Sequence, residues 1–233
     1  MISVIICSIN KNLAEQVQKS ISETIGVPWE AIIIDNTQCP HGITRIYNMG
    51  ASKAQYDILC FVHEDVIFSS QNWGNTLITH FNNDLELGLI GIAGSKYKSN
   101  KPSGWYTHIH QADCCNVWHK DSKGHNQRIL LTPNPASSYE QVVCLDGVFL
   151  CTRKNVWNEH PFDEDLLKGF HLYDIDFSIR ISKIYKAIVT YEIHIIHLTE
   201  GGDFGNKWVD ETQLWHQKNK LQLPVFSNDL MPN

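Results

Sequence analysis

The segment Ile58-Leu-Cys-Phe-Val-His-Glu-Asp-Val-Ile67 decides the fold, because an apolar run meets three polar residues there and then resumes. Residues 58–62 have the length and composition of a buried strand. The strand runs into His63-Glu64-Asp65. Two carboxylates at the end of a core strand need a cation or a ligand to meet them, or else they belong to a solvated turn whose Asp caps the next helix. This segment alone leaves both interpretations open.

The composition is that of one globular domain with a net negative charge. The chain has 233 residues, of which 42% are hydrophobic and 10% aromatic, enough to bury one substantial core. The net charge of −6 and the lack of clustered lysine and arginine exclude nucleic acid as the main partner. No apolar run approaches the ~20 residues of a membrane span, and the first residues lack the basic region of a signal peptide. We therefore expect a cytoplasmic protein without a transmembrane segment, and leave peripheral membrane contact and the oligomeric state open.

Cysteine usage favours reduced thiols. The seven cysteines are odd in number and scattered, and several lie in apolar, strand-like runs: Cys7, Cys60, Cys144 and Cys151. This pattern suits buried thiols better than a disulfide framework. Histidines and cysteines also gather at 108–125, but the adjacent Cys114-Cys115 lacks the spacing of a zinc site, so we expect a loop there.

Alternating strands and helices predict a parallel sheet. Apolar strands are expected at 3–7, 31–34 and 56–62, separated by two helical segments. This order implies parallel pairing with right-handed crossovers, which brings Asp35 and the acidic pair to one edge of the sheet. Further along we expect helices at 75–81, 155–159 and 169–181, and strands at 88–93, 142–151 and 187–197.

These residues, in this order, resemble the inverting nucleotide-sugar glycosyltransferases of the GT-A fold, broadly family 2. The resemblance covers most of residues 3–198. It rests on Ser8, Asp35, Tyr47-Asn48-Met49-Gly50, His63-Glu64-Asp65 at the D-x-D position, Leu145-Asp146-Gly147-Val148, Asp174-Ile-Asp176-Phe-Ser-Ile-Arg180 at the "ED" motif, and His197. It implies an α/β fold of the GT-A (nucleotide-diphospho-sugar transferase) type, a Rossmann-like mixed sheet with helices on both faces.

The resemblance also implies how the chain is divided. A single GT-A-like domain would span 1–233. Within it we expect a nucleotide-sugar-binding half at 1–94, a long insertion or lid at 95–141, an acceptor half at 142–200 and a mobile C-terminal tail at 201–233. The insertion is expected to be largely irregular and to order over the donor.

The chemistry of such transferases gives these residues roles. Transfer from a nucleoside diphosphate breaks an anomeric C–O bond, and a divalent cation, Mn²⁺ or Mg²⁺, can offset the charge of the leaving diphosphate. The implied metal ligands are Asp65 and His197. Asp174 is the implied catalytic base, with Asp176 as the alternative. Implied donor contacts are Ser8, Asp35, Asn48, Glu64 and Asp65, and implied acceptor contacts are Asp146, Gly147 and Trp105.

Two positions depart from the family pattern. His63 stands where D-x-D begins with a carboxylate, and Tyr173 stands at the first acid of the "ED" pair. On the residues alone, Asp35 also fits a turn cap and His197 an ordinary strand histidine. Asp174 falls in the first turn of a predicted helix, where the helix dipole is expected to hold a carboxylate ionised at neutral pH.

We therefore expect an enzyme: a metal-dependent, inverting hexosyltransferase that moves a sugar from a UDP-sugar to a glycan or glycolipid acceptor in polysaccharide biosynthesis. The alternative is a non-catalytic GT-A-like protein that binds a nucleotide or a glycan, which the two departures keep open. An α/β nucleotide hydrolase finds no support, because no Gly-rich phosphate loop follows the first strand.

Overall fold

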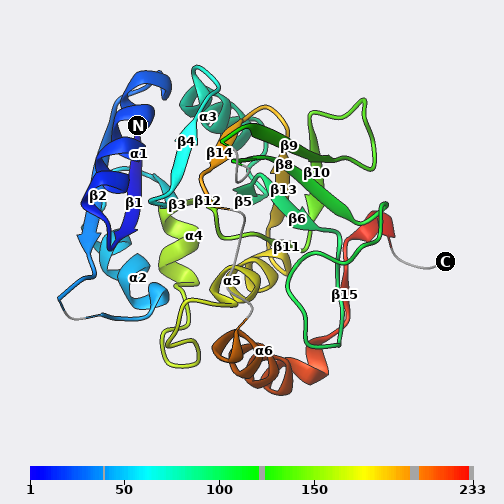
Figure 1. Ribbon diagram of the computed structural model, residues 1–233. Coiled ribbons are helices and arrows are strands. Elements are labelled where there is room, and N and C mark those ends of the chain that lie inside the picture. Colours follow the sequence, from blue (N-terminus) through cyan, green and yellow to red (C-terminus); the bar gives the residue numbers. More distant parts are fainter. Residues whose placement is uncertain (39, 121–123, 200–204, 231–233) are drawn as a thin grey trace.

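The computed structural model describes residues 1–38, 40–120, 124–199 and 205–230 (Figure 1). The first half alternates strands and helices: β1 (Ile2–Ser8), α1 (Lys11–Thr24), β2 (Trp29–Asp35), α2 (Ile43–Lys53) and β3 (Ile58–His63). Helix α1 begins after Asn10 because the Asn10 side chain accepts hydrogen bonds from the amides of Asn12 and Leu13. Strand β1 pairs in parallel with both β2 and β3, which confirms the predicted parallel pairing.

These strands belong to a seven-stranded sheet with the order β10-β13-β5-β12-β3-β1-β2. Strand β12 runs antiparallel to β3 and β5, so the sheet is mixed as predicted. Its other strands are β5 (Leu87–Gly91), β10 (Tyr139–Val142), β12 (Phe149–Arg153) and β13 (Lys186–Thr190). The remaining helices that pack against this sheet are α3 (Trp73–Asn83), α4 (Lys154–Glu159) and α5 (Tyr173–Ser182).

Helices cover both faces of this sheet because its strands are apolar on both sides. Along β3, Phe61 points into a core cluster shared with α2, α4 and α5, whereas Cys60 and Val62 point into a second cluster shared with α1 and α3. Side chains that alternate along a strand point to opposite faces. The core therefore has two layers, one on each side of the sheet.

A second, six-stranded sheet has the order β11-β6-β8-β14-β4, with β9 paired to β8. Its strands are β4 (Val66–Phe68), β6 (Ala93–Ser95), β8 (Asp113–Lys120), β9 (Asn126–Leu131), β11 (Cys144–Leu145) and β14 (Ile195–His197). Strands β8 and β9 lie within the insertion predicted at 95–141, whereas its residues 99–112 and 132–138 belong to no helix or strand. Strand β8 forms because Cys115 and Val117 are buried in the core and because β6 and β14 supply backbone partners on either side.

The predicted last strand at 187–197 is two strands. Strand β13 lies in the first sheet and β14 in the second, with residues 191–194 between them. The apolar run could not reveal this switch, because either sheet buries an apolar strand equally well. The consequence is that His197 leaves the first sheet and lies beside β4.

The predicted mobile tail is wrong for residues 205–230. This segment contains α6 (Asn206–Asn219), a 3₁₀ turn (Lys220–Gln222), β15 (Val225–Phe226) and a second 3₁₀ turn (Asn228–Leu230), and β15 pairs with β7 (Tyr97–Lys98). Helix α6 lies below α5 in Figure 1. Its Trp215 is 1% exposed, so burial of a large indole holds the segment in place. Residues 201–204 lie outside the described residues.

The expectation of reduced thiols is wrong for one pair. Cys60 on β3 and Cys151 on β12 are direct neighbours across the antiparallel pairing, with their Cα atoms 4.3 Å apart, and they form a disulfide. Sequence spacing could not reveal the pair, because 91 residues separate them. Cys7 and Cys144 are free, as predicted.

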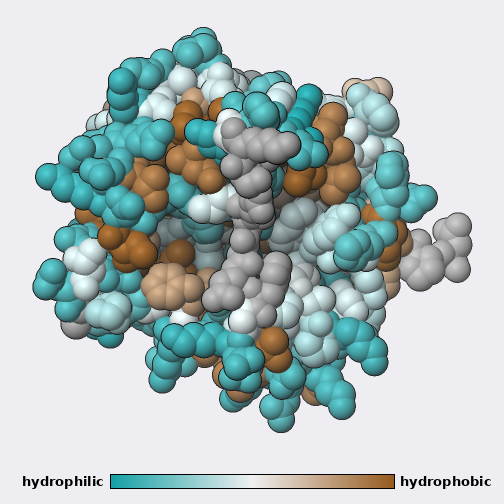
Figure 2. All heavy atoms as spheres, viewed as in Figure 1, coloured by the Kyte–Doolittle hydropathy of each residue, from teal (hydrophilic) through white to brown (hydrophobic). Residues whose placement is uncertain are grey.

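Two surface features complete the fold. None of the helices in the described ranges combines the length and the apolarity needed to cross a membrane. On the face seen in Figure 2, hydrophobic residues lie in small groups separated by hydrophilic ones.

Candidate active site

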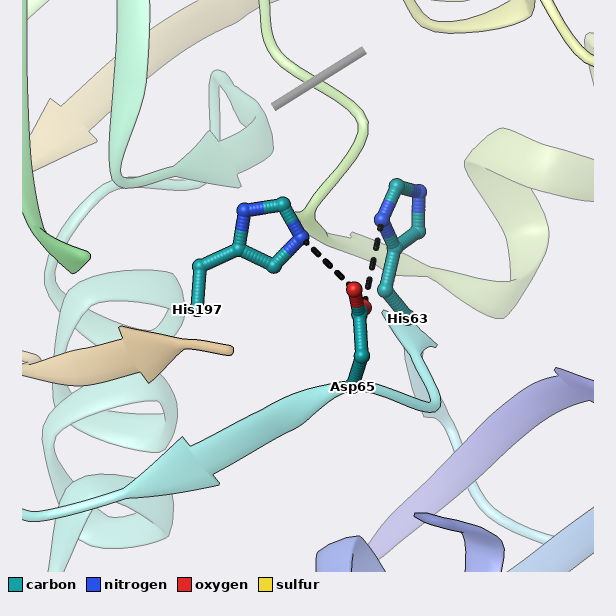
Figure 3. A group of neighbouring side chains, drawn as sticks. All are labelled: His63, Asp65 and His197. Carbon is teal, nitrogen blue, oxygen red and sulfur yellow. Dashed lines mark ion pairs between the residues drawn. The ribbon is translucent and has the colours of Figure 1, made fainter. Parts of the chain in front are cut away.

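Three side chains from two distant segments meet beyond the end of β3. His63 ends β3, Asp65 lies in the turn before β4, and His197 ends β14 (Figure 3). Strand β14 is antiparallel to β4 and places His197 opposite Val66, so its ring faces Asp65. His197 Nε2 is 3.2 Å from Asp65 Oδ2, and His63 Nδ1 is 4.0 Å from Asp65 Oδ1. The predicted neighbours Asp65 and His197 are thus together.

The electrostatics of this group favour a cation. Burial alone would raise the pKa of Asp65, but the hydrogen bond and charge of His197, together with His63, lower that pKa to about 2. Burial and the charge of His197 lower the pKa of His63. One ligand atom from each of the three residues lies within 4.8 Å of the others. A carboxylate and neutral imidazoles are donors that divalent transition metals accept.

From the sequence, His63 replaces a carboxylate ligand of the family pattern and was not expected to bind the metal. In the structure, His63 is one of the three residues that could hold a metal ion. A second histidine was also missed: His119 on β8 lies opposite His197 across the parallel pairing, with ring centroids 5.5 Å apart. The strand register that joins β8 to β14 gives no sequence signal. Among the described residues, the histidines and cysteines at 108–125 form no metal-binding group of their own.

Ser8 and Glu64 lie together at the ends of β1 and β3. The Ser8 hydroxyl donates a hydrogen bond of 2.7 Å to Glu64, whose carboxylate also accepts from the amides of Ile9 and Asn10. Ile9 and Asn10 lie just before α1, so these bonds reach the turn that leads into the helix. Glu64 therefore fixes the start of α1 at the edge of the sheet beside Asp65.

The other two predicted donor contacts, Asp35 and Asn48, differ in whether their side chains are available to a ligand. Asp35 is exposed at the end of β2, where hydrogen bonds from the Thr37 hydroxyl and amide lower its pKa. The Asn48 amide, in contrast, is engaged within the protein. It donates to the carbonyl of Phe162 and accepts from Trp157 Nε1 and the Phe162 amide, so it fastens α2 to the segment after α4. These contacts argue against the predicted donor role of Asn48.

Asp174 lies in the first turn of α5, as predicted. Its carboxylate accepts hydrogen bonds of 2.9 Å from the amides of Gly147 and Ile175. Burial nevertheless raises the pKa of Asp174, the charge of Asp146 raises it further, and the two amides offset only part of the rise, leaving the pKa at about 7. The expectation that the helix dipole keeps this group fully ionised at neutral pH is therefore wrong. A carboxyl group that titrates near pH 7 is suited to proton transfer.

The predicted acceptor residues adjoin Asp174. Trp105 Nε1 donates a hydrogen bond of 2.6 Å to Asp146 Oδ2, and the Val148 amide donates to Asp146 Oδ1. The loop that carries Trp105 is thereby held against the turn at 146–148. Since the Gly147 amide binds Asp174, the structure brings Trp105, Asp146 and Gly147 to the same site as the candidate base.

The surroundings of Asp176 argue against it as the alternative base. It is 4% exposed, and both of its oxygens are engaged: Arg180 Nε donates to Oδ2 at 2.8 Å, and Trp215 Nε1 donates to Oδ1 at 2.9 Å. Burial and the ion pair with Arg180 keep this carboxylate away from a substrate and stabilise its charge. Asp176 instead links α5 to α6.

A groove of about 1050 Å³ lies between residues 40–42, the loop that precedes α5, and α6. Its lining combines the half-exposed ring of Phe170 with charged side chains such as Asp163, Lys168 and Lys207. None of the predicted site residues lines it.

Comparison with known proteins gives one family. A model described as a glycosyltransferase-like family matches residues 3–221. No curated protein sequence matches the chain. Two solved structures that are similar hold a nucleotide and manganese. GalNAc-T7 with UDP, GalNAc and Mn²⁺ aligns with a TM-score of 0.62 at 12% identity, over 94% of this chain and 49% of that one. The Pyrobaculum calidifontis mannosyltransferase PcManGT with GDP-Man and Mn²⁺ gives 0.55 at 12% identity, over 95% and 73%.

A third similar structure, S. aureus TarS 1–349 in complex with UDP, gives a TM-score of 0.54 at 12% identity, over 84% of this chain and 60% of that one. The chain thus spans about half the length of the GalNAc-T7 structure. Likeness at this identity shows the fold, which is the GT-A fold of nucleotide-sugar transferases as predicted. The family match covers nearly the whole chain, and the chain therefore belongs to the glycosyltransferase-like family.

Proposed function

We propose that the protein is a metal-dependent, inverting glycosyltransferase that moves a sugar from a UDP-sugar to a glycan or glycolipid acceptor. The observation that carries this proposal is the pairing of two unlike groups at one site. An anionic carboxylate with two imidazoles lies beyond β3, and a carboxyl group with a pKa of about 7 begins α5. The first set suits a cation, and the second suits a general base.

The donor side is formed by His63, Asp65 and His197, which would hold a Mn²⁺ or Mg²⁺ ion. Such an ion, when bound, neutralises the charge that develops on a leaving diphosphate. Ser8 and Glu64 fix the end of β1 beside this set, and the exposed Asp35 at the end of β2 is available to a nucleoside. The carboxyl ends of parallel strands are where such folds bind nucleotides.

The acceptor side is formed by Asp174. In its ionised form it takes the proton from the attacking hydroxyl, and the amides of Gly147 and Ile175 hold the carboxylate in position. Side-chain donors hold the other two carboxylates, Trp105 for Asp146 and Arg180 and Trp215 for Asp176, whereas the hydrogen bonds that Asp174 accepts come from backbone amides. Direct displacement with inversion needs one carboxylate as base, whereas retention through a covalent intermediate needs a second carboxylate as nucleophile.

The donor side is tested by thermal stability. UDP or GDP should raise the melting temperature more with Mn²⁺ or Mg²⁺ than with a chelator, because a ligand that binds the folded state stabilises it. Asp65→Ala should remove the difference, while Asp57→Asn, at an exposed position before β3, should keep it. Equal shifts with and without chelator would refute metal-dependent binding.

The acceptor side is tested by transfer from UDP-sugars to a panel of glycans and glycolipids. Asp174→Asn should leave donor binding intact and lower transfer by a factor on the order of 10² or more, the usual share of a general base. The anomeric configuration of the product, read by NMR, should be inverted. If the wild type binds nucleotide with metal yet transfers to no acceptor, the protein is a non-catalytic binding protein and the proposed enzyme is wrong.

A further inference from the structure

The two departures from the family pattern, His63 and Tyr173, contact each other. His63 Nε2 lies 2.7 Å from the Tyr173 hydroxyl oxygen. The same hydroxyl lies 3.2 Å from the carbonyl oxygen of Gly147. Tyr173 is 4% exposed, and its ring packs against Tyr47 and Phe162, so the hydroxyl is held in place.

This pair of contacts fixes where the protons lie. A carbonyl oxygen can only accept, so the Tyr173 hydroxyl donates its single proton to Gly147. The phenolic oxygen must then accept from His63, which requires the proton of a neutral His63 ring to be on Nε2. His63 Nδ1 is left with a lone pair.

The lone pair of Nδ1 faces another electron-rich atom. Nδ1 is 4.0 Å from Asp65 Oδ1, and a carboxylate oxygen can only accept. Two acceptors that face each other repel unless a positive charge lies between them. The arrangement therefore presents Nδ1 and the carboxylate to a cation.

Gly147 is required for this arrangement by its lack of a side chain. A Cβ atom at position 147 would lie 2.1 Å from the Tyr173 hydroxyl oxygen, closer than any real contact. The same residue donates its amide proton to Asp174. Gly147 thus anchors Tyr173 on one side and the candidate base on the other.

We propose that Tyr173, anchored by the Gly147 carbonyl, is a positioning residue that holds His63 in the Nε2–H tautomer and so makes His63 Nδ1 a third ligand of the cation. This proposal rests on the cation site of the proposed function. Hydrogen bonds to the non-ligating nitrogen of a histidine commonly fix its tautomer, and their loss weakens metal binding by about 10- to 100-fold.

The tautomer is measured on the wild-type protein by a ¹H–¹⁵N correlation spectrum of the histidine rings without metal. The His63 signals are those lost in His63→Gln. We expect the Nε2–H tautomer in the wild type and a mixture of tautomers in Tyr173→Phe. The wild-type spectrum needs only the variant that assigns the His63 signals. The wild-type result therefore tests the proposal even if Tyr173→Phe folds poorly.

Metal affinity is measured with Mn²⁺ alone, from the loss of the free-ion EPR signal on titration. Tyr173→Phe should bind Mn²⁺ about 10- to 100-fold more weakly than the wild type. The matched control is Tyr47→Phe, which removes the hydroxyl of the neighbouring ring. Because Tyr47 adjoins the Tyr173 hydroxyl, a second control is Tyr185→Phe, which removes a hydroxyl that donates to Glu159 away from the site and should leave Mn²⁺ affinity unchanged.

The outcomes separate this proposal from the proposed function. An Nδ1–H tautomer in the wild type, or equal Mn²⁺ affinity in Tyr173→Phe and the wild type, overturns the role of Tyr173 and leaves the metal-dependent transferase standing. A wild type that has the Nε2–H tautomer but binds no Mn²⁺ overturns the cation site itself, and with it the ligand role of His63.

Discussion

The indole Nε1 of Trp215 donates a hydrogen bond of 2.9 Å to Asp176 Oδ1, and this bond joins the C-terminal helix α6 to the helix that carries Asp174. Both partners are almost fully buried, and Arg180 occupies the other oxygen of Asp176. Beside Trp215 on α6, His216 Nε2 accepts a hydrogen bond of 2.8 Å from the buried Lys98. Helix α6 is therefore docked by buried polar contacts as well as by apolar packing.

Trp215→Phe should lower the free energy of unfolding by about 1–3 kcal/mol, because the change leaves a buried carboxylate oxygen without its donor. Denaturant unfolding measures the loss. Gln213→Ala, at an exposed position on the same helix, is the control and should stay within about 0.5 kcal/mol of the wild type. Equal unfolding midpoints for Trp215→Phe and the wild type would show that the Trp215–Asp176 bond does not hold α6.

The raised pKa of Asp174 predicts opposite effects of pH on activity and on stability. The base is active when ionised, so transfer should increase with pH and level off above about 7. The folded protein keeps a proton that the unfolded chain has lost between about pH 4 and 7, so this group makes the protein less stable as pH rises through that range. Asp174→Asn should therefore gain stability relative to the wild type as the pH is raised from 4 to 8.

Asp146→Asn should move the pH dependence of transfer toward lower pH. The charge of Asp146 contributes to the raised pKa of Asp174, and an amide removes that charge while keeping an oxygen for the Trp105 indole. The measurement is kcat/KM against pH for both proteins, with Asp57→Asn as the control for loss of a distant carboxylate. Should the curves of Asp146→Asn and the wild type rise at the same pH, Asp174 is not the group that titrates.

The Cys60–Cys151 disulfide predicts a difference in thiol counts. Alkylation of the unfolded chain, read by intact mass, should label two more cysteines after reduction than before it. Reduction should also lower the free energy of unfolding by about 2–4 kcal/mol, because the bond closes a long loop in the unfolded chain. The same number of labelled cysteines with and without reductant would mean that both residues are thiols, as their sequence context alone suggested.

Local sequence patterns predict the first half of the fold and the place of the site. Apolar runs that alternate with helical periodicity predict β1, β2 and β3, because β1 and β3 are buried on both faces and β2 pairs along the outer edge of β1. Parallel strands end at the same edge, so the placement of Asp35 at one edge with Glu64 and Asp65 followed from their positions alone. The position of Asp174 in the first turn of α5 could also be predicted, because a short sequence motif marks it.

The partners of these residues depend on long-range contacts that local patterns do not predict. Residues 191–197 switch sheets and bring His197 to Asp65, Trp215 engages the carboxylate that had been the alternative base, and Tyr173 meets His63. The pKa of Asp174 depends likewise on burial and on Asp146, which outweigh the local effect of the helix. Each of these outcomes is set by contacts between segments distant in the chain. Hydrophobic periodicity indicates which side chains are buried, but it does not indicate which other side chains they contact.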